Sequence, residues 1–233
     1  PRVEYAFLAL LLACKAVLLW RALGQTIGFD AGAHLEMLDF FAWSRPYGDI
    51  RAHFYSYHPP LGFLLPRTLM LAGFSPVVSV QLVSFGASLA AFFLLRATLR
   101  TLGLLHHPGA IAFLYLSASI PVQTYLSTSV NLDVLVVALA AAALHCSVRL
   151  FWMREERAER FLLGAGLVTA IACAMLTKFS GLLLAAIPVL VAFAAADRGL
   201  LRRMAVSGAL AGFALTIVAP YYYTRYYVRE GKF

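Results

Sequence analysis

Ionisable side chains are scarce in this apolar chain, and several of them lie beside hydrophobic runs, where they could support chemistry. Asp30 and His34 follow the first of these runs. Asp133 opens a later run, and Lys178 separates two more. Charged groups at membrane depth are costly, so they usually line a cavity or a substrate path. A lysine beside lipid could bind an anionic headgroup while a carboxylate takes a proton from an incoming nucleophile. These residue types therefore indicate transfer of a group from a lipid phosphate.

The composition indicates that the elements positioning these residues are membrane helices. Of 233 residues, 62% are hydrophobic and 13% are charged, and the mean hydropathy is +0.80. Such values lie far outside the range of soluble domains and predict a polytopic membrane protein. Because lipid offers no hydrogen-bond partners, membrane spans must be helices or a closed barrel. Long apolar runs such as 134–144 lack the period-two alternation of barrel strands, which predicts an all-α bundle.

Seven hydrophobic runs approach the roughly 20 residues that a helix needs to cross a bilayer. They are 5–23, 77–95, 109–126, 132–152, 161–177, 179–196 and 204–222. We therefore expect one membrane domain over 1–233, in which residues 24–76 form a long first loop. The Tyr-rich basic end resembles the start of another extramembrane segment, and the sequence leaves open a further C-terminal region.

The long first loop contains two segments that fit helices lying in the membrane interface. Residues 60–73 are apolar but short, and they include a proline and an arginine. Residues 30–43 place Leu35, Leu38 and Phe41 on one side of a helix and polar residues on another. This pattern predicts an amphipathic helix directly after the first span.

The distribution of basic residues predicts the orientation in the membrane. The short loops 96–108, 149–160 and 198–203 contain nine arginines, whereas the opposite short turns contain only Lys178. The positive-inside rule then places the N-terminus in the cytoplasm and the loop 24–76 outside. The formal net charge of +8 comes largely from arginines that flank spans and meet lipid phosphates, and it does not indicate a nucleic-acid partner. We expect an integral protein of a bacterial inner or plasma membrane.

Four short motifs fall at the predicted outer face. They read Phe29-Asp30, Tyr57-His58-Pro59-Pro60-Leu61-Gly62, Asn131-Leu132-Asp133 and Leu176-Thr177-Lys178-Phe179-Ser180. In order and spacing, they resemble the motifs of C-type (GT-C) integral membrane glycosyltransferases, in particular protein O-mannosyltransferases and lipid A aminoarabinose transferases. The His-Pro-Pro-Leu-Gly and Leu-Thr-Lys-aromatic runs are the more specific of the four. The family's seven-helix module is also similar to the seven runs counted above.

The resemblance implies a sugar donor linked to polyprenyl phosphate and a lipid, glycan or protein acceptor outside the cytoplasm. Asp30 stands at the position of the family's catalytic base, and an inverting displacement would release the lipid phosphate. We expect six further residues to bind substrate: His34, Tyr57, His58, Asp133, Lys178 and Arg225. Two departures argue against protein O-mannosylation. Ala31 stands where that branch usually carries a second acid, and His34 lies one residue further on than the family's histidine.

The resemblance also bears on metal dependence. The first loop lacks the Asp-x-Asp pair of the metal-requiring oligosaccharyltransferase branch, so we expect no essential divalent ion and no other cofactor. The residues alone leave a metal open. Cys14, Cys146 and Cys173 lie inside apolar runs without metal-ligand spacing, which indicates core positions.

Each candidate residue also has a structural interpretation. Asp30 precedes a predicted helix and could cap it. Lys178 could extend its ammonium to the interface, and His58 before two prolines could order a turn. Asp133 suits the first turn of a helix, where the helix dipole favours an acid. Arg225, among several tyrosines, resembles an interfacial anchor.

Two other functions fit the same residues. A transporter or lipid-binding protein would line a path with polar groups, but transporters usually place their site near the bilayer midplane, often at broken helices in repeated halves. The polar residues here gather at one predicted face and no repeat is evident, which favours an enzyme. A scaffold that has lost catalysis is the other alternative, and Ala31 mildly favours it. Lys15, inside the first run, is expected to snorkel or pair rather than react.

Overall fold

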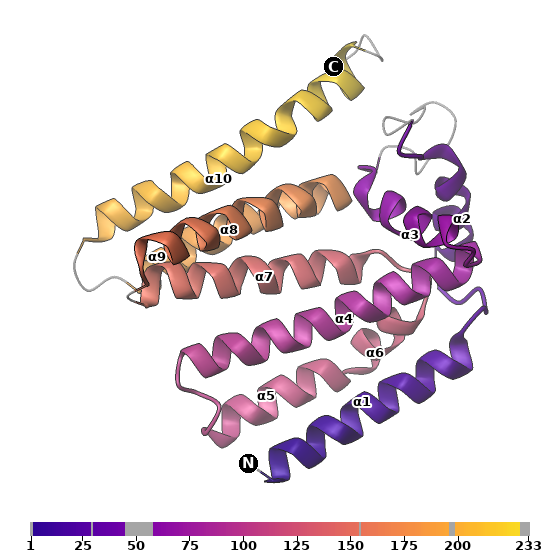
Figure 1. Cartoon of the computed structure of the whole chain (residues 1–233), viewed down its shortest axis with the longest axis horizontal. Helices are drawn as coiled ribbons and strands as arrows, with labels where there is room; N and C mark the ends of the chain where they lie inside the picture. The colour runs from indigo at the N-terminus through magenta and orange to yellow at the C-terminus, as the bar shows by residue number, and fades with distance from the viewer. Residues whose placement is uncertain (1, 29, 45–57, 154, 196–198, 229–233) are drawn as a thin grey trace. The chain divides into compact units, whose positions relative to one another are not determined.

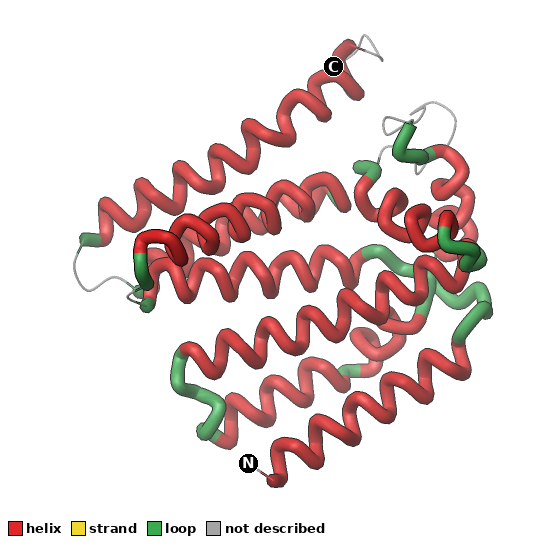
Figure 2. Tube along the Cα trace, in the orientation of Figure 1, coloured by secondary structure: helices red, strands yellow, loops and turns green. Residues whose placement is uncertain are grey.

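The computed structural model describes residues 2–28, 30–44, 58–153, 155–195 and 199–228. Throughout these ranges the regular elements are helices and none is a strand (Figure 2). The predicted all-α fold is confirmed. The chain forms two compact units, residues 1–138 and residues 139–233.

Four helices of the first unit pack side by side (Figure 1). They are α1 (Arg2–Ala22), α4 (Pro76–Thr101), α5 (Pro108–Ser119) and α6 (Pro121–Thr128). Polar groups join three of them at one end. Arg96 of α4 pairs with Glu4 of α1 at 2.7 Å, and the Tyr115 hydroxyl of α5 donates to the Glu4 carbonyl at 3.1 Å. Such interhelical hydrogen bonds hold membrane helices together where no hydrophobic force between helices operates.

The connection between α5 and α6 bends one predicted span. Pro121 follows Ile120, and a proline disfavours helical geometry in the residue before it. Ile120 accordingly has φ −51° and ψ 132°, and the two helices meet at a bend of 49°. The predicted run 109–126 is therefore a bent pair of helices instead of one straight span.

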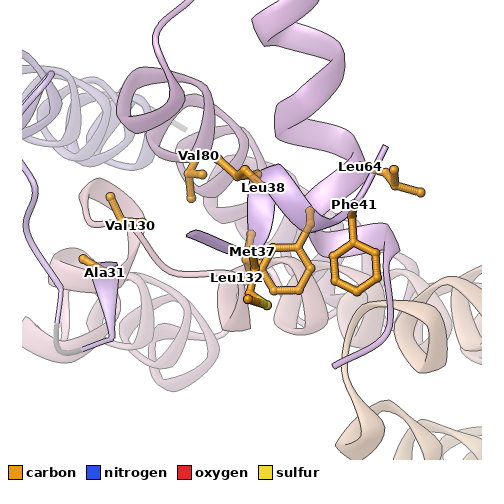
Figure 3. Close-up of a cluster of buried hydrophobic side chains, with 9 residues drawn as sticks. Ala31, Met37, Leu38, Phe41, Leu64, Val80, Val130 and Leu132 are labelled. Carbon is orange, nitrogen blue, oxygen red and sulfur yellow. The ribbon is translucent and has the colours of Figure 1, made fainter. Parts of the chain in front are cut away.

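Two short helices cover one end of α4 and anchor the first loop. They are α2 (Ala31–Phe40) and α3 (Leu61–Leu71), and they confirm the two helices predicted in that loop. Phe41, at the end of α2, stacks on Phe63 of α3 with ring centroids 5.2 Å apart. Figure 3 shows their buried cluster, whose members are Ala31, Met37, Leu38, Phe41, Phe63, Leu64, Val80, Val130 and Leu132. The apolar side of α2 therefore packs on protein.

The second unit contains most of α7 (Asp133–Trp152), which begins in the first unit, and the elements after it. These are α8 (Arg157–Thr177), the 3-10 helix η2 (Phe179–Ala185), α9 (Ala186–Ala194), α10 (Leu200–Tyr222) and the π-helical turn η3 (Tyr223–Val228). Arg149 of α7 pairs with Glu155 at 2.7 Å and with Glu159 of α8. A hydrogen bond shared with Glu159 and one donated by Arg149 hold the pKa of the Glu155 carboxyl below its ordinary value. These contacts close the turn between α7 and α8.

The helices of the described ranges that could span a membrane are fewer than the seven predicted runs. In the part of the chain that the structure describes, five helices are long and apolar enough to cross a membrane: α1, α4, α7, α8 and α10. The bent pair α5–α6 makes a sixth if it counts as one span. The predicted run 179–196 forms the shorter apolar helix Phe179–Ala194, which begins with 3-10 geometry. The polytopic membrane bundle is confirmed, but the count of seven spans is not.

Candidate functional site

Asp30 lies where the first loop enters α2. It occupies the N-cap position and is half-buried, and its carbonyl accepts the first helical hydrogen bond, from the His34 amide at 2.9 Å. Its carboxylate makes no capping hydrogen bond to the helix. Helix capping therefore does not account for this acid.

A glycine brings the loop before Asp30 against the connection between α6 and α7. The Val130 amide of that connection donates to the Ile27 carbonyl at 2.8 Å. Gly28 has φ +148°, and a Cβ there would lie 3.0 Å from the Val130 carbonyl oxygen. Only glycine suits both the backbone angle and this close approach. The segment before Asp30 and the connection between α6 and α7 are far apart in sequence and are thus held side by side.

His34 faces the same connection from α2. Its Nδ1 lies 3.4 Å from the Val130 carbonyl oxygen, and its ring centroid lies 6.2 Å from that of Phe63. The imidazole is half-buried. It therefore sits beside the segment that leads to Asp133.

Asp133 is half-buried at the first position of α7. The side-chain oxygen of Asn131 accepts a hydrogen bond from the Asp133 amide at 2.6 Å, and the Ser84 hydroxyl of α4 donates to the Asn131 carbonyl. The Asn131 side chain thus takes the capping role at this helix start. The helix dipole still favours an acid at Asp133, as the sequence predicts.

The proline pair of the second motif starts α3. His58 is half-buried and precedes Pro59 and Pro60, which are both buried, and Pro60 occupies the N-cap position of α3. This start places Phe63 against His34 and the aromatic cluster. Tyr57 lies outside the described residues, so its predicted role stays a prediction.

Three of the four motif segments therefore meet in the first unit. The hydrogen bond between Ile27 and Val130 joins the Asp30 segment to the Asp133 segment, and the cluster of Figure 3 joins both to α3. The arrangement gathers two carboxylates and an imidazole around one connection. Such groups can accept and pass a proton.

Lys178 lies in the second unit, where α8 gives way to η2. The residue is half-buried and extended, with φ −153° and ψ 146°. Its amide donates to Ala174 at 2.9 Å, and its carbonyl accepts from Gly181 at 2.8 Å. The next residue, Phe179, packs edge-on against Tyr222 with ring centroids 5.5 Å apart. The fourth motif is thus tied to the end of α10.

Arg225 follows at that same end of α10. Its side chain is 0% exposed, so it is buried in the protein and is not an exposed interfacial anchor. The Nη1 group donates to the Tyr221 hydroxyl, and the guanidinium lies 5.7 Å from the Tyr221 ring centroid. The neighbouring Tyr222 hydroxyl donates to the Met175 carbonyl near the end of α8 at 2.6 Å. The segments carrying Lys178 and Arg225 are therefore packed together, and two cations suit a phosphate.

A cavity and a group of metal ligands are two further features that could mark a functional site. A cavity of about 160 Å³ between α4, α5, α6 and α7 has mostly apolar walls, with Ser88, Ser117 and Gln123 as polar members, and none of the predicted site residues that the structure describes lines it. Across the described ranges, no group of three or more His, Cys, Asp or Glu side chains is placed to hold a metal ion. Metal dependence stays a prediction.

The polar residues of α4 that bond to the segments carrying this site were not predicted from the sequence. Gln81 and Ser84 are fully buried and bond to the segments before Asp30 and before Asp133. The sequence does contain a sign of their role, because residues three apart lie on one face of a helix and polar residues are rare in an apolar span.

Comparison with known protein families identifies the family of this chain. The model of the dolichyl-phosphate-mannose-protein mannosyltransferase family matches residues 57–223, a range that includes His58, Asp133 and Lys178 but begins after Asp30 and His34. No curated protein and no solved structure matches the chain. The matched range covers well over half of the sequence, and its helices include most of the apolar helices described above. The chain belongs to the dolichyl-phosphate-mannose-protein mannosyltransferase family and is an integral membrane glycosyltransferase of the C type.

Proposed function

We propose that the protein transfers a sugar from a polyprenyl-phosphate-linked donor to a lipid, glycan or protein acceptor at the extracytoplasmic face of the membrane. The family match over residues 57–223 is the observation that carries this proposal. The outer face offers no nucleotide sugars, so a donor there must arrive activated on a lipid. The positive-inside pattern of the short loops supports this orientation.

Residues predicted from the sequence have a proposed role in each part of the reaction. Lys178 and Arg225 supply positive charge for the donor phosphate. Asp30 takes the proton of the acceptor hydroxyl, with His34 and Asp133 as polar neighbours along the same connection. The acceptor oxygen then bonds to the anomeric carbon from the side opposite the phosphate. The bond from that carbon to the phosphate oxygen breaks, and its electron pair leaves with the lipid phosphate, so the configuration inverts.

The base assignment predicts a large loss of turnover in Asp30→Asn. Removing a general base typically costs about 10²–10⁴-fold in rate. Asp39→Asn is the matched control, because Asp39 lies in α2, the helix that follows Asp30, is exposed and pairs with Arg67 at 3.5 Å. The assay would use the full-length protein in detergent with radiolabelled dolichyl-phosphate mannose, measuring both labelled product and released dolichyl phosphate.

The outcomes separate the alternatives. Turnover by Asp30→Asn equal to that of Asp39→Asn would exclude Asp30 as the base. No transfer by the unaltered protein with mannose, glucose or aminoarabinose donors would favour the transport or lipid-binding alternative. The bend between α5 and α6 is the structural observation in favour of that alternative, since broken helices often form transporter sites.

A further inference from the structure

The Gln81 side chain has hydrogen-bond contacts with four other residues in the interior of the first unit. It lies in the second turn of α4 and is 0% exposed. A glutamine inside an apolar span is costly unless all of its polar groups have partners. Its partners therefore reveal why the position is polar.

The Gln81 amide links three segments of the chain. Its Oε1 accepts from the Gly24 amide at 2.9 Å. Its Nε2 lies 2.8 Å from the Ala22 carbonyl oxygen, 3.1 Å from that of Gln25 and 3.1 Å from that of Thr128. One side chain thus holds the end of α1, the start of the first loop and the end of α6.

Ser84 continues the same polar face one turn further along α4. Its hydroxyl donates to the Asn131 carbonyl, three residues beyond the Thr128 carbonyl that Gln81 binds. Between these two anchors, the Val130 amide bonds to Ile27 in the first loop. Helix α4 therefore acts as a rigid support that aligns the segment before Asp30 with the segment before Asp133.

We propose that Gln81 is a positioning residue for Asp30: by binding the first loop and the α6–α7 connection together, it sets where the Asp30 carboxylate stands relative to Asp133. The effect on catalysis rests on the proposed function, whereas the alignment of the segment before Asp30 with the segment before Asp133 does not. Misplacing a reacting group by about 1 Å can cost on the order of 10²-fold in rate, so such a support has a measurable effect.

Whether Gln81 holds the two segments together can be tested without any substrate. Gln81→Met keeps the length of the side chain and removes its hydrogen bonds. Gln123→Met is the matched control, since Gln123 lies on α6 in the same unit and lines the apolar cavity instead of bonding to the first loop. Hydrogen exchange measured by mass spectrometry on the intact protein should show at least ~10-fold faster exchange in peptides covering 22–30 and 128–132 for Gln81→Met. The control and the helices of the second unit should match the parent.

The link to Asp30 is tested by kinetics in a mutant cycle. Gln81→Met should lower kcat for transfer from dolichyl-phosphate mannose by at least ~10-fold, with the donor KM changing by less than ~3-fold. Combined with Asp30→Asn, it should cost nothing further, because it acts through the acid that is already removed. Gln123→Met should transfer at the parent rate in both backgrounds.

Each outcome decides one part of the proposal. Parent-like exchange at 22–30 and 128–132 in Gln81→Met would show that Gln81 does not hold these two segments together. Faster exchange with parent-like kcat, or a full additional loss in the Asp30→Asn background, would overturn the role as a positioning residue. Absence of transfer by the parent would instead defeat the proposed function, and the exchange experiment would still decide whether Gln81 holds the loop.

Discussion

Several polar side chains buried inside the first unit bond to a neighbouring helix, and Lys15 is the clearest single residue. It lies in the middle of α1 and is 1% exposed. Its ammonium donates to the Ser88 hydroxyl of α4 at 3.1 Å and to the Ser127 hydroxyl of α6 at 3.5 Å. The sequence predicted a lysine that snorkels or pairs, and the structure shows it paired with hydroxyls across helices. Snorkelling is wrong for this residue.

The burial of Lys15 predicts that its charge is not needed for stability. Replacing a buried ionic group by an apolar one of similar volume is often neutral or stabilising by about 1–4 kcal/mol. Lys15→Met should therefore unfold at or above the parent's midpoint in a denaturant titration in detergent. Lys15→Ala, which leaves a cavity, should be less stable than Lys15→Met by about 2 kcal/mol. Equal losses in both variants would show that the ammonium–hydroxyl bonds themselves hold the three helices together.

Among the elements, the junction of α8 and η2 depends on one glycine. Gly181 packs over the last turn of α8, where a Cβ would overlap the Ala174 carbonyl and lie 2.7 Å from the Met175 amide nitrogen. Those neighbours are backbone atoms, which cannot move aside as a flexible side chain can. The Gly181 amide also donates to the Lys178 carbonyl at 2.8 Å. The close approach therefore fixes the backbone of the fourth motif.

This contact predicts that Gly181→Ala disrupts the junction. Overpacking typically costs about 1–3 kcal/mol, and a clash with backbone falls at the upper end of that range. We expect a lower thermal midpoint in detergent and a weaker affinity for the donor, because Lys178 moves with the junction. Gly208→Ala in α10 is the control: a Cβ there meets nothing within 4 Å, and alanine improves helix propensity by up to about 1 kcal/mol. A Gly181→Ala protein as stable as Gly208→Ala would contradict the tight packing.

For the whole molecule, orientation in the membrane decides whether the site can meet a lipid-linked donor. Helix α4 is long and apolar enough to span, so the connections at its two ends should lie on opposite sides. The basic short loop 96–108 predicts that its C-terminal end is cytoplasmic. The α2–α3 end and the Asp30 segment would then face outward.

Cysteine labelling tests this orientation. In a protein whose Cys14, Cys146 and Cys173 are replaced by alanine, Ala72→Cys should react with a membrane-impermeant maleimide added outside intact cells. His106→Cys should react only after the cells are permeabilised. Both positions are exposed. The reverse pattern would place the site in the cytoplasm, and labelling of both from one side would show that α4 does not span.

Much of the fold could be predicted because it is set locally. In lipid each helix must satisfy its own backbone hydrogen bonds, so hydropathy and run length indicate where the helices are. The amphipathic helix after Asp30 followed from side-chain spacing, and the short helix after Pro60 followed from an apolar run too short to span. The family motifs were readable for a similar reason, since each is a contiguous run of residues.

The tertiary structure alone decided features that depend on which distant segments meet. The bend at Pro121 reduced one predicted span to a pair of helices, and the packing of Gly181 shaped the run after Lys178. Arg225 proved buried, and the bonds from Gln81 to the start of the first loop and to the end of α6 were not foreseen. Hydropathy records how apolar a segment is, but not which partner its few polar groups find. The residue types that support membrane chemistry are thus written in the sequence, while their register is set by hydrogen bonds between helices far apart along the chain.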